Sequence, residues 1–306
     1  GCSIVVKPAP ETPLDAYILA DALDEAGVPK GVVSIVPGGR ELGEYLITHP
    51  GIDKVGFTGS TAAGRRIAAL CGERLRRVTL ELGGKSAAIV CEDADFAGMI
   101  PMIVGAGTMN DGQACVAQTR ILLPRSRYKE GVEALAAAVG GLKVGEPNDP
   151  TTKIGPLVAE RQRDRVLGYV AKGKQEGARC VVGGGRPKGL DRGYFVEPTL
   201  FADVENGMTI AREEIFGPVL CAIPYDGEED AIRIANDSEY GLSGSVWTND
   251  PKRGIDIARR IRTGTHNVNF FMMAMTSPFG GFKSSGIGRE LGPEGLRAYL
   301  EPKSIC

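Results

Sequence analysis

KVGFTGSTAAG, residues 54–64, is the stretch of sequence that decides the fold. It starts as an apolar strand, turns at Gly59, and continues as a helix that Ser60 can cap. The same cycle of strand, short turn and helix repeats on both sides of it. Near-continuous apolar strands that alternate with helices predict a doubly wound parallel sheet. The predicted strands lie at 3–7, 32–36, 54–57 and 77–82, and the helices at 13–26, 40–48 and 61–71.

A second series of strands and helices begins near Ser86 and predicts a second α/β domain. Residues 140–160 are rich in Gly, Pro, Asn and Asp, which indicates a surface excursion. The predicted strands lie at 86–90, 120–123, 179–182, 194–201 and 243–247, and the helices at 94–109, 126–139, 158–176, 228–236 and 251–262.

The composition narrows the class of protein. A chain of 306 residues with 42% hydrophobic and 24% charged residues predicts one large or two medium globular domains. Its net charge of −2 offers no basic field for nucleic acid or an acidic membrane, and no apolar run is long enough to cross a bilayer. Seven scattered cysteines and two histidines predict neither a disulfide framework nor a metal site. We therefore expect a soluble, cytoplasmic protein.

Four segments of the first series fall at the carboxyl ends of predicted strands, where ligands bind in doubly wound sheets. The free N–H groups of a helix that begins after Gly59 and Ser60 favour a phosphate. The alternative for Gly59 and Ser60 is a structural helix cap. The alternative for Lys7 is a solvated lysine at a strand end. The four segments are Lys7, 37–39, 58–60 and 81–84.

Cys115 and Glu81 are the two candidates for covalent and acid–base chemistry. Cys115 ends the polar, glycine-containing run NDGQAC, which differs from a core position. Glu81 follows an apolar strand and precedes Gly83 and Gly84, and a half-buried glutamate can have its pKa raised toward neutrality. The alternative for Cys115 is one more buried thiol, and the alternative for Glu81 is an ordinary salt-bridge partner.

Two later segments are also candidates for binding. In residues 213–219, EEIFGPV, a carboxylate can accept hydrogen bonds from ribose hydroxyls and a phenylalanine can pack on a nicotinamide ring. The alternative is a helix end followed by a strand. Residues 277–286, SPFGGFKSSG, suit a substrate-channel loop or a long turn.

Taken together, these segments resemble the signature segments of the aldehyde dehydrogenase superfamily, in order and at similar spacing. The matching segments are 57–64, 81–86, 112–115, 213–219 and 277–286, with Val6-Lys7-Pro8 before them, and the resemblance covers residues 1–306. It implies that Cys115 is the nucleophile that forms a thiohemiacetal and then a thioester. It also implies that Glu81 is the base that activates water, and that the Cys115 N–H supplies half of an oxyanion hole.

The resemblance implies NAD as cofactor, with NADP possible because Pro10 stands where NAD-preferring members carry an acid. Lys7 and Glu214 would hold the riboses, and Phe216 the nicotinamide end. The full set of implied cofactor residues is Lys7, Gly59, Ser60, Gly64, Leu82, Glu214 and Phe216.

The resemblance further implies a partial cofactor domain at 1–83, a catalytic domain at 84–284 and a return to the cofactor domain at 285–298. Residues 299–306 would form an oligomerisation strand in a homodimer or homotetramer. Family members carry an upstream stretch that includes an oxyanion-hole Asn, so the sequence is expected to be a fragment. An apolar aldehyde is the expected substrate if the aromatic and methionine residues at 270–275, with Phe271 and Phe279 in the pocket, line the entrance. The alternative is that they pack in the core.

Two other functions stay open beside aldehyde oxidation. The chain could be a catalytically impaired fragment that still binds a dinucleotide. It could also be a structural subunit that uses its last residues for assembly.

Overall fold

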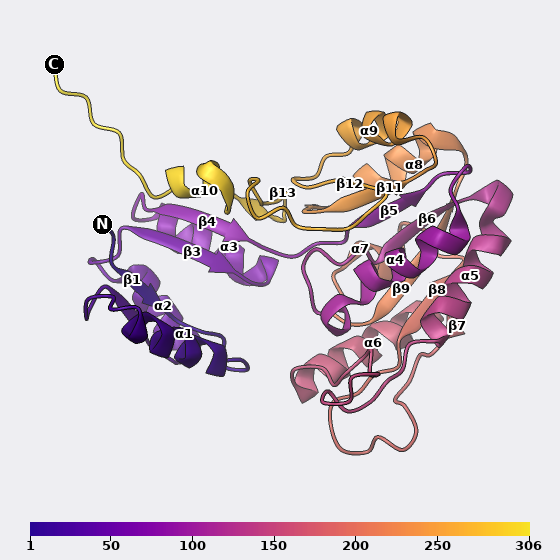
Figure 1. Cartoon of the computed structure of the whole chain (residues 1–306), viewed down its shortest axis with the longest axis horizontal. Helices are drawn as coiled ribbons and strands as arrows, with labels where there is room; N and C mark the ends of the chain where they lie inside the picture. The colour runs from indigo at the N-terminus through magenta and orange to yellow at the C-terminus, as the bar shows by residue number, and fades with distance from the viewer. The chain divides into compact units, whose positions relative to one another are not determined.

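The structure, a computed structural model, describes all residues 1–306 and divides into two compact units (Figure 1). The first unit comprises residues 1–55 and 65–78, and the second comprises residues 56–64 and 79–306. The resemblance implies different domain boundaries, after residues 83, 284 and 298. These boundaries stay a prediction.

The first unit contains a parallel pair of strands. Strand β1 (Ile4–Val6) pairs with β2 (Val33–Ile35), and helix α1 (Leu14–Glu25) connects them. Gly27 follows the end of α1 with φ of 73°, a left-handed conformation that favours glycine. Helix α2 (Arg40–Thr48) follows β2.

A three-stranded sheet has the order β14-β4-β3, from β3 (Lys54–Thr58), β4 (Arg77–Glu81) and β14 (Gly286–Ile287). The four strands predicted for one sheet therefore lie in two. Strand β14 runs antiparallel to β4 and pairs Gly286 with Glu81. A Cβ added at Gly286 would overlap the Leu80 carbonyl oxygen, so this close pairing requires glycine. Helix α3 (Thr61–Gly72) joins β3 to β4.

The largest sheet has seven strands in the order β12-β11-β5-β6-β9-β8-β7. Neighbours are parallel except for β7, which is antiparallel to β8. The strand predicted at 194–201 begins only at Thr199, because Pro198 has no N–H to donate to a ladder. The strands are β5 (Ala87–Val90), β6 (Arg120–Pro124), β7 (Arg179–Val182), β8 (Thr199–Ala202), β9 (Val219–Tyr225), β11 (Gly244–Trp247) and β12 (Asn267–Val268).

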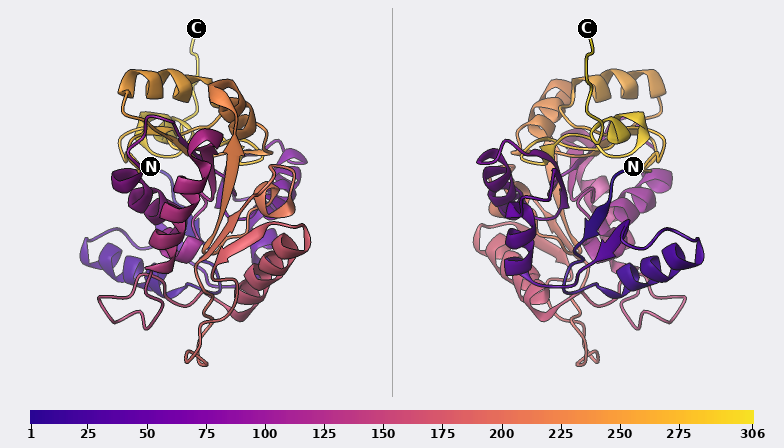
Figure 2. Two further views of the ribbon diagram at one scale, coloured as in Figure 1. Left: turned by 90° about the vertical axis from the view of Figure 1, so that its right-hand side faces the viewer. Right: turned by 90° about the vertical axis from the view of Figure 1, so that its left-hand side faces the viewer.

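Helices cover both faces of this sheet (Figure 2), which confirms the predicted α/β class. Ala88 and Val90 face a core that includes α4 and α5, whereas Ala87 and Ile89 face a core that includes α6, α8 and α9. The alternation follows from the two-residue period of a strand. The helices are α4 (Phe96–Thr108), α5 (Tyr128–Gly140), α6 (Glu160–Gln175), α8 (Gly227–Asn236) and α9 (Pro251–Arg260).

The remaining elements are short. They are the 3-10 helices η1 (Met109–Gly112) and η2 (Arg125–Arg127), helices α7 (Thr209–Arg212) and α10 (Gly292–Arg297), and strands β10 (Tyr240–Gly241) and β13 (Phe282–Lys283). The single chain gives residues 299–306 neither helix nor strand, so the strand expected there is not formed within one copy. Pairing of these residues with a second copy stays a prediction.

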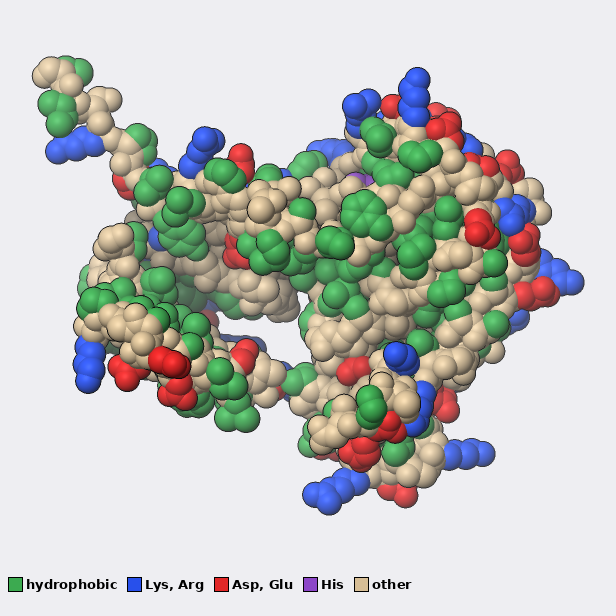
Figure 3. Space-filling view, viewed as in Figure 1, with side chains coloured by type: hydrophobic (Ala, Val, Ile, Leu, Met, Phe, Trp, Pro, Cys, Tyr) green, Lys and Arg blue, Asp and Glu red, His purple; other side chains and the backbone are tan.

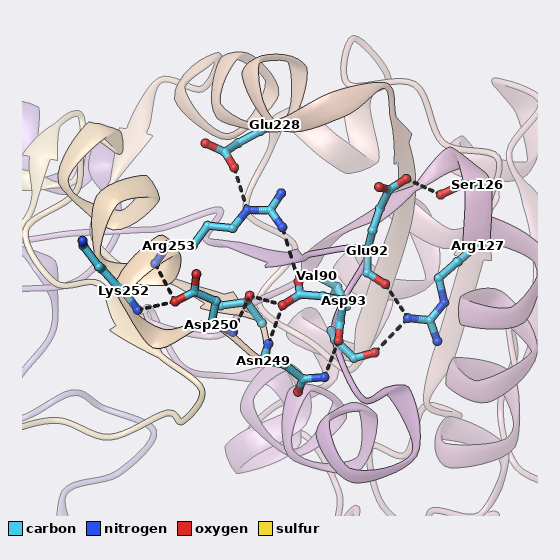
Figure 4. Close-up of polar contacts among 12 residues, drawn as sticks. Val90, Glu92, Asp93, Ser126, Arg127, Glu228, Asn249, Asp250, Lys252 and Arg253 are labelled. Carbon is cyan, nitrogen blue, oxygen red and sulfur yellow. Dashed lines mark hydrogen bonds and ion pairs between the residues drawn. The ribbon is translucent and has the colours of Figure 1, made fainter.

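A polar network closes the carboxyl end of β5 (Figure 4). Asp93 Oδ2 accepts hydrogen bonds from the Thr248 hydroxyl (2.7 Å) and the Asn249 N–H (2.8 Å). Arg253 links the other oxygen of Asp93 (3.5 Å) to Glu228 (2.8 Å). This edge of the sheet is thus occupied by structural contacts. On the face of the second unit shown in Figure 3, acidic and basic side chains are interspersed.

Candidate active site

Sheet topology brings together segments that are far apart in the sequence. Strands β5, β6 and β9 are parallel neighbours, so their amino ends meet at one edge of the large sheet. Residues 81–84 precede β5, Cys115 precedes β6, and residues 213–217 precede β9. The three predicted segments therefore converge on the amino edge, opposite the Asp93 network.

Glu81, the last residue of β4, is a buried carboxylate. Its side chain is 2% exposed, and neither carboxylate oxygen has a hydrogen-bond partner within the chain. Burial, together with the charge of nearby Glu290, raises the pKa of Glu81 to about 8 against the opposing effect of Arg289. Gly280 leaves room beside it, since an added Cβ would lie 2.6 Å from Glu81 Oε1. Such a group can act as a general base near neutral pH.

Cys115 lies in a turn between η1 and β6 and is partly exposed. Burial raises the pKa of the Cys115 thiol to about 11, and the charges of Glu214 and Glu81 add to the effect. A thiol with a raised pKa needs a base or a nearby positive charge before its sulfur can react as a thiolate. A Cβ added at Gly84 would overlap the Cys115 carbonyl oxygen, so this close approach requires glycine.

The turn before Cys115 has an unusual backbone. Asn110, Asp111 and Gly112 have φ of 49°, 59° and 73°, so three successive residues are left-handed. Gly112 lies against residues 217–218, and an added Cβ would overlap the Gly217 backbone. The loop that carries Cys115 and the segment before β9 are therefore packed backbone against backbone.

Glu214 and Phe216 line a small pocket with Gly84, Gly112 and Ala114. Glu214 Oε1 accepts a hydrogen bond from the Gly84 N–H (2.9 Å), and burial raises the pKa of the Glu214 carboxyl. Phe216 has φ of 61°, and its carbonyl oxygen accepts a hydrogen bond from Gln162 (2.6 Å). The two predicted cofactor residues thus border the loop that carries Cys115.

The two predicted substrate-pocket residues pack beside Cys115. Phe279 is buried with Val116 and Leu242, and Phe271, Ala114, Cys115 and Leu291 pack against this cluster. By contrast, Phe270 and Met272 are 50% and 65% exposed, and Met273 and Met275 are exposed as well. Core packing is therefore the wrong interpretation for these four side chains in the single chain, whereas Phe271 does pack.

The predicted phosphate turn has local structural roles. The Ser60 hydroxyl accepts a hydrogen bond from the Ala63 N–H (3.3 Å), and the Gly59 N–H donates to the Glu81 carbonyl (3.0 Å). A Cβ added at Gly64 would lie 2.5 Å from the Leu82 methyl groups. Packing alone thus accounts for Gly64 and Leu82.

Lys7 belongs to the first unit. Its ammonium group donates hydrogen bonds to the carbonyl oxygens of Pro8 (2.8 Å) and Gly38 (3.0 Å). The side chain is therefore held against the backbone that follows β1 and β2.

The sequence analysis did not identify two buried basic residues at the amino edge of the large sheet. The Arg120 guanidinium, 2% exposed, donates to the carbonyl oxygens of Lys85, Ile234 and Ala235 and to Asn206. Lys85 is also 2% exposed, its Nζ has no partner within the chain, and burial lowers the pKa of its ammonium group. The only signal in the sequence was a charged residue beside each apolar strand, which is typical of solvated strand ends.

No group of three or more His, Cys, Asp or Glu side chains is arranged to hold a metal ion. The helices are all too short or too polar to span a bilayer.

The fold is that of an α/β protein in which a cysteine and a buried glutamate lie near one edge of the large sheet. The model of the aldehyde dehydrogenase family matches residues 1–305. The chain belongs to the aldehyde dehydrogenase family. A geranial dehydrogenase of Castellaniella defragrans is 55% identical over 305 residues, which is 100% of this chain and 63% of the relative. The chain thus spans less than two thirds of that relative's length.

Solved structures agree with this result. An aldehyde dehydrogenase of Mycobacterium tuberculosis in complex with NAD+ is 60% identical with a TM-score of 0.97, over 98% of this chain and 62% of that one. A Cys-to-Ala variant of aldehyde dehydrogenase C from Pseudomonas syringae, with NAD+ and octanal, is 42% identical with a TM-score of 0.97, over 99% of this chain and 63% of that one.

Proposed function

We propose that the protein oxidises an apolar aldehyde to the carboxylic acid with NAD(P)+, through a covalent intermediate on Cys115. The observation that carries the proposal is the convergence of Cys115 and Glu81, with a pKa for Glu81 of about 8, on one edge of the large sheet. Family membership supports it.

In the proposed reaction the Cys115 sulfur, as thiolate, attacks the aldehyde carbon and forms a thiohemiacetal. The backbone N–H of Cys115 donates to the developing oxyanion. NAD(P)+, which Glu214 and Phe216 would hold beside the Cys115 loop, would supply the hydride acceptor for oxidation of the thiohemiacetal to the Cys115 thioester. Glu81 then takes a proton from a water molecule, which attacks the thioester carbonyl, and the Cys115 thiolate departs with release of the acid.

The cofactor assignment rests on three sets of residues that are considered separately. Glu214 and Phe216 line the pocket beside the nucleophile loop, which fits the ribose and nicotinamide end. Gly59 and Ser60 precede α3, a helix long enough for its N-terminus to favour a phosphate. Lys7, Gly64 and Leu82 are proposed from the resemblance alone. The NAD+ complex of the Mycobacterium tuberculosis relative favours NAD over NADP.

The substrate is proposed to be apolar. Phe271 and Phe279 pack beside Cys115, and Phe270 and Met272 add exposed apolar surface in the same segment. Geranial and octanal, named for two relatives, are apolar aldehydes. A betaine aldehyde dehydrogenase of Brucella melitensis is 44% identical, so a cationic aldehyde is the competing substrate class.

A homodimer or homotetramer is proposed, with residues 299–306 pairing with a second copy. Tyr299, Leu300 and Ile305 support this assembly because they place three exposed apolar side chains within one short segment. A cytoplasmic location is proposed for the enzyme.

NADH formation with octanal and with betaine aldehyde tests the proposed function, with Cys115→Ala as the matched control. Octanal is expected to be oxidised with the higher kcat/KM, and the variant is expected to be inactive. Binding of NAD+ without turnover of either aldehyde would favour a dinucleotide-binding fragment. Neither binding nor turnover would favour a structural subunit.

A further inference from the structure

The loop that carries Cys115 is tied to a distant segment by two side chains. Asp111 Oδ1 accepts a hydrogen bond from the Gly155 N–H (2.8 Å), and Gln113 Oε1 accepts one from the Val158 N–H (3.0 Å). Asp111 and Gln113 lie four and two residues before the sulfur-bearing residue. Both bonds join the loop to residues 155–158, which end the excursion between α5 and α6.

That excursion is ordered by contacts of its own. The backbone of Lys143 accepts hydrogen bonds from Lys153 and Ile154, and the Lys143 ammonium group donates to Asp149 (2.6 Å) and Thr151 (2.6 Å). Ile154 and Leu157 are buried. The Gly155 N–H is therefore presented to Asp111 from a fixed backbone.

The backbone at Asp111 needs such support. Asp111 is a non-glycine residue with φ of 59° between two further left-handed residues, a conformation that persists only where surrounding contacts enforce it. Within the turn, Asn110 Nδ2 donates to the Gln113 carbonyl (3.1 Å). This bond joins residues 110 and 113 and does not connect the turn to the rest of the protein. The bond from Gly155 is the long-range contact made by the side chain of Asp111 itself.

We infer that Asp111 is a positioning residue for Cys115: its carboxylate, by accepting the Gly155 N–H, holds the left-handed turn that sets the place of the sulfur. The inference rests on the proposed role of Cys115 as nucleophile. Asp111 itself touches neither of the proposed reacting groups, and acts through the backbone of residues 110–115. Gly112 against Gly217 and Gly84 against Cys115 fix the other two sides of the loop.

Three substitutions separate the hydrogen bond from the backbone preference. Asp111→Asn keeps an acceptor and tolerates the left-handed region, Asp111→Gly keeps only the backbone freedom, and Asp111→Ala keeps neither. The measurements are kcat and KM for NAD+ and octanal, and amide hydrogen exchange of residues 109–118 and of Gly155. Asp203→Ala is the matched control, since Asp203 is also a left-handed aspartate (φ of 57°) and its carboxylate accepts a hydrogen bond from Arg179, outside both the Cys115 loop and the excursion.

Asp111→Ala and Asp111→Gly are expected to lower kcat by up to about 10²-fold, because a small displacement of a reacting group costs that much. KM for NAD+ should stay unchanged, and exchange at 109–118 and at Gly155 should quicken. Asp111→Asn should keep kcat and protection close to those of the wild-type protein, as should Asp203→Ala.

The inference is overturned if Asp111→Ala keeps the wild-type kcat and protection, or if Asp111→Gly matches Asp111→Asn. The second result would mean that backbone freedom, not the hydrogen bond, matters. Failure of the proposed function can be distinguished from failure of this inference, because hydrogen exchange is measured without substrate. A wild-type protein without aldehyde oxidation would reject the function and still report whether Asp111 orders the loop.

Discussion

At the scale of single residues, Glu81 stands out because a carboxylate is buried without a hydrogen-bond partner in the chain. Such an arrangement disfavours the charged form and costs stability. A water molecule could donate a hydrogen bond to the Glu81 carboxylate, because no donor of the chain occupies its oxygens. The stability cost and the proposed base function therefore have the same physical origin.

Glu81→Gln is predicted to slow steady-state turnover by about 10²–10⁴-fold, the range expected for loss of a general base. A first burst of NADH should remain, because attack by Cys115 and hydride transfer precede the step that needs Glu81. Rapid-mixing absorbance would measure the burst and the slow phase separately. Glu73→Gln, outside the predicted site, is the control, and an unchanged slow phase in Glu81→Gln would contradict the role.

The raised pKa of Glu81 predicts a pH dependence with a definite sign. A base works when deprotonated, so the thioester hydrolysis rate should rise as pH rises through about 8. Stability should move in the opposite direction: because the folded pKa exceeds the unfolded value of 4.5, unfolding becomes easier as pH rises from 4.5 to about 8. Single-turnover rates and thermal melts between pH 5 and 10 would check both; a melting temperature that rises over this range only in the wild-type protein, and not in Glu81→Gln, would contradict the assignment.

At the scale of secondary-structure elements, glycines decide how closely the segments before β5, β6 and β9 meet. Gly84 faces the Cys115 carbonyl, and Gly112 faces Gly217. These contacts are between backbones, which cannot move aside as a flexible side chain can. Close approach at the amino edge therefore depends on the absence of two Cβ atoms.

Gly84→Ala is predicted to lower kcat and the melting temperature together, because the new Cβ displaces the Cys115 carbonyl. Gly105→Ala is the matched control, since nothing lies within 4 Å of its added Cβ. That change lies within helix α4 and should stabilise the protein by about 0.5–1 kcal/mol. Kinetics and thermal melts of both variants would check the contrast, and equal effects would contradict it.

The Asp93 network at the opposite edge is predicted to affect stability without affecting chemistry. Asp93→Ala removes the acceptor for Thr248 and for the Asn249 N–H, which should cost about 1–3 kcal/mol. Asp93→Asn, which keeps one acceptor, should cost less. Denaturant unfolding would measure both losses, while kcat should stay at the wild-type value; a fall in kcat without a fall in stability would contradict the structural role.

At the scale of the whole molecule, the last residues are predicted to govern assembly. Removal of residues 299–306 takes away three exposed apolar side chains and a segment that forms neither helix nor strand in the single chain. Light scattering after size exclusion should then show a smaller oligomer than for the intact protein. Lys303→Ala, which leaves the backbone and the apolar side chains in place, is the control, and an unchanged oligomer after removal would reject the proposal.

Much of the fold followed from the sequence because it depends on local periodicity. The strands near 87–90, 120–124 and 179–182 and the intervening helices could be predicted from apolar spacing and glycine turns. The distribution of strands over separate sheets could not. Pairing of Gly286 with Glu81 joins residues far apart in the chain, and no local pattern encodes it.

The candidate site divides in the same way. The sequence by itself determined which residues are the candidates for the chemistry, since Cys115 and Glu81 lie in short segments whose composition and order are recognisable. Only the tertiary structure decided that residues before β5, β6 and β9 meet, that Lys85 and Arg120 are buried, and that Asp111 bonds to Gly155. The reason is physical: a local pattern fixes backbone conformation, whereas burial and long-range hydrogen bonds depend on which distant segments the sheet order places side by side.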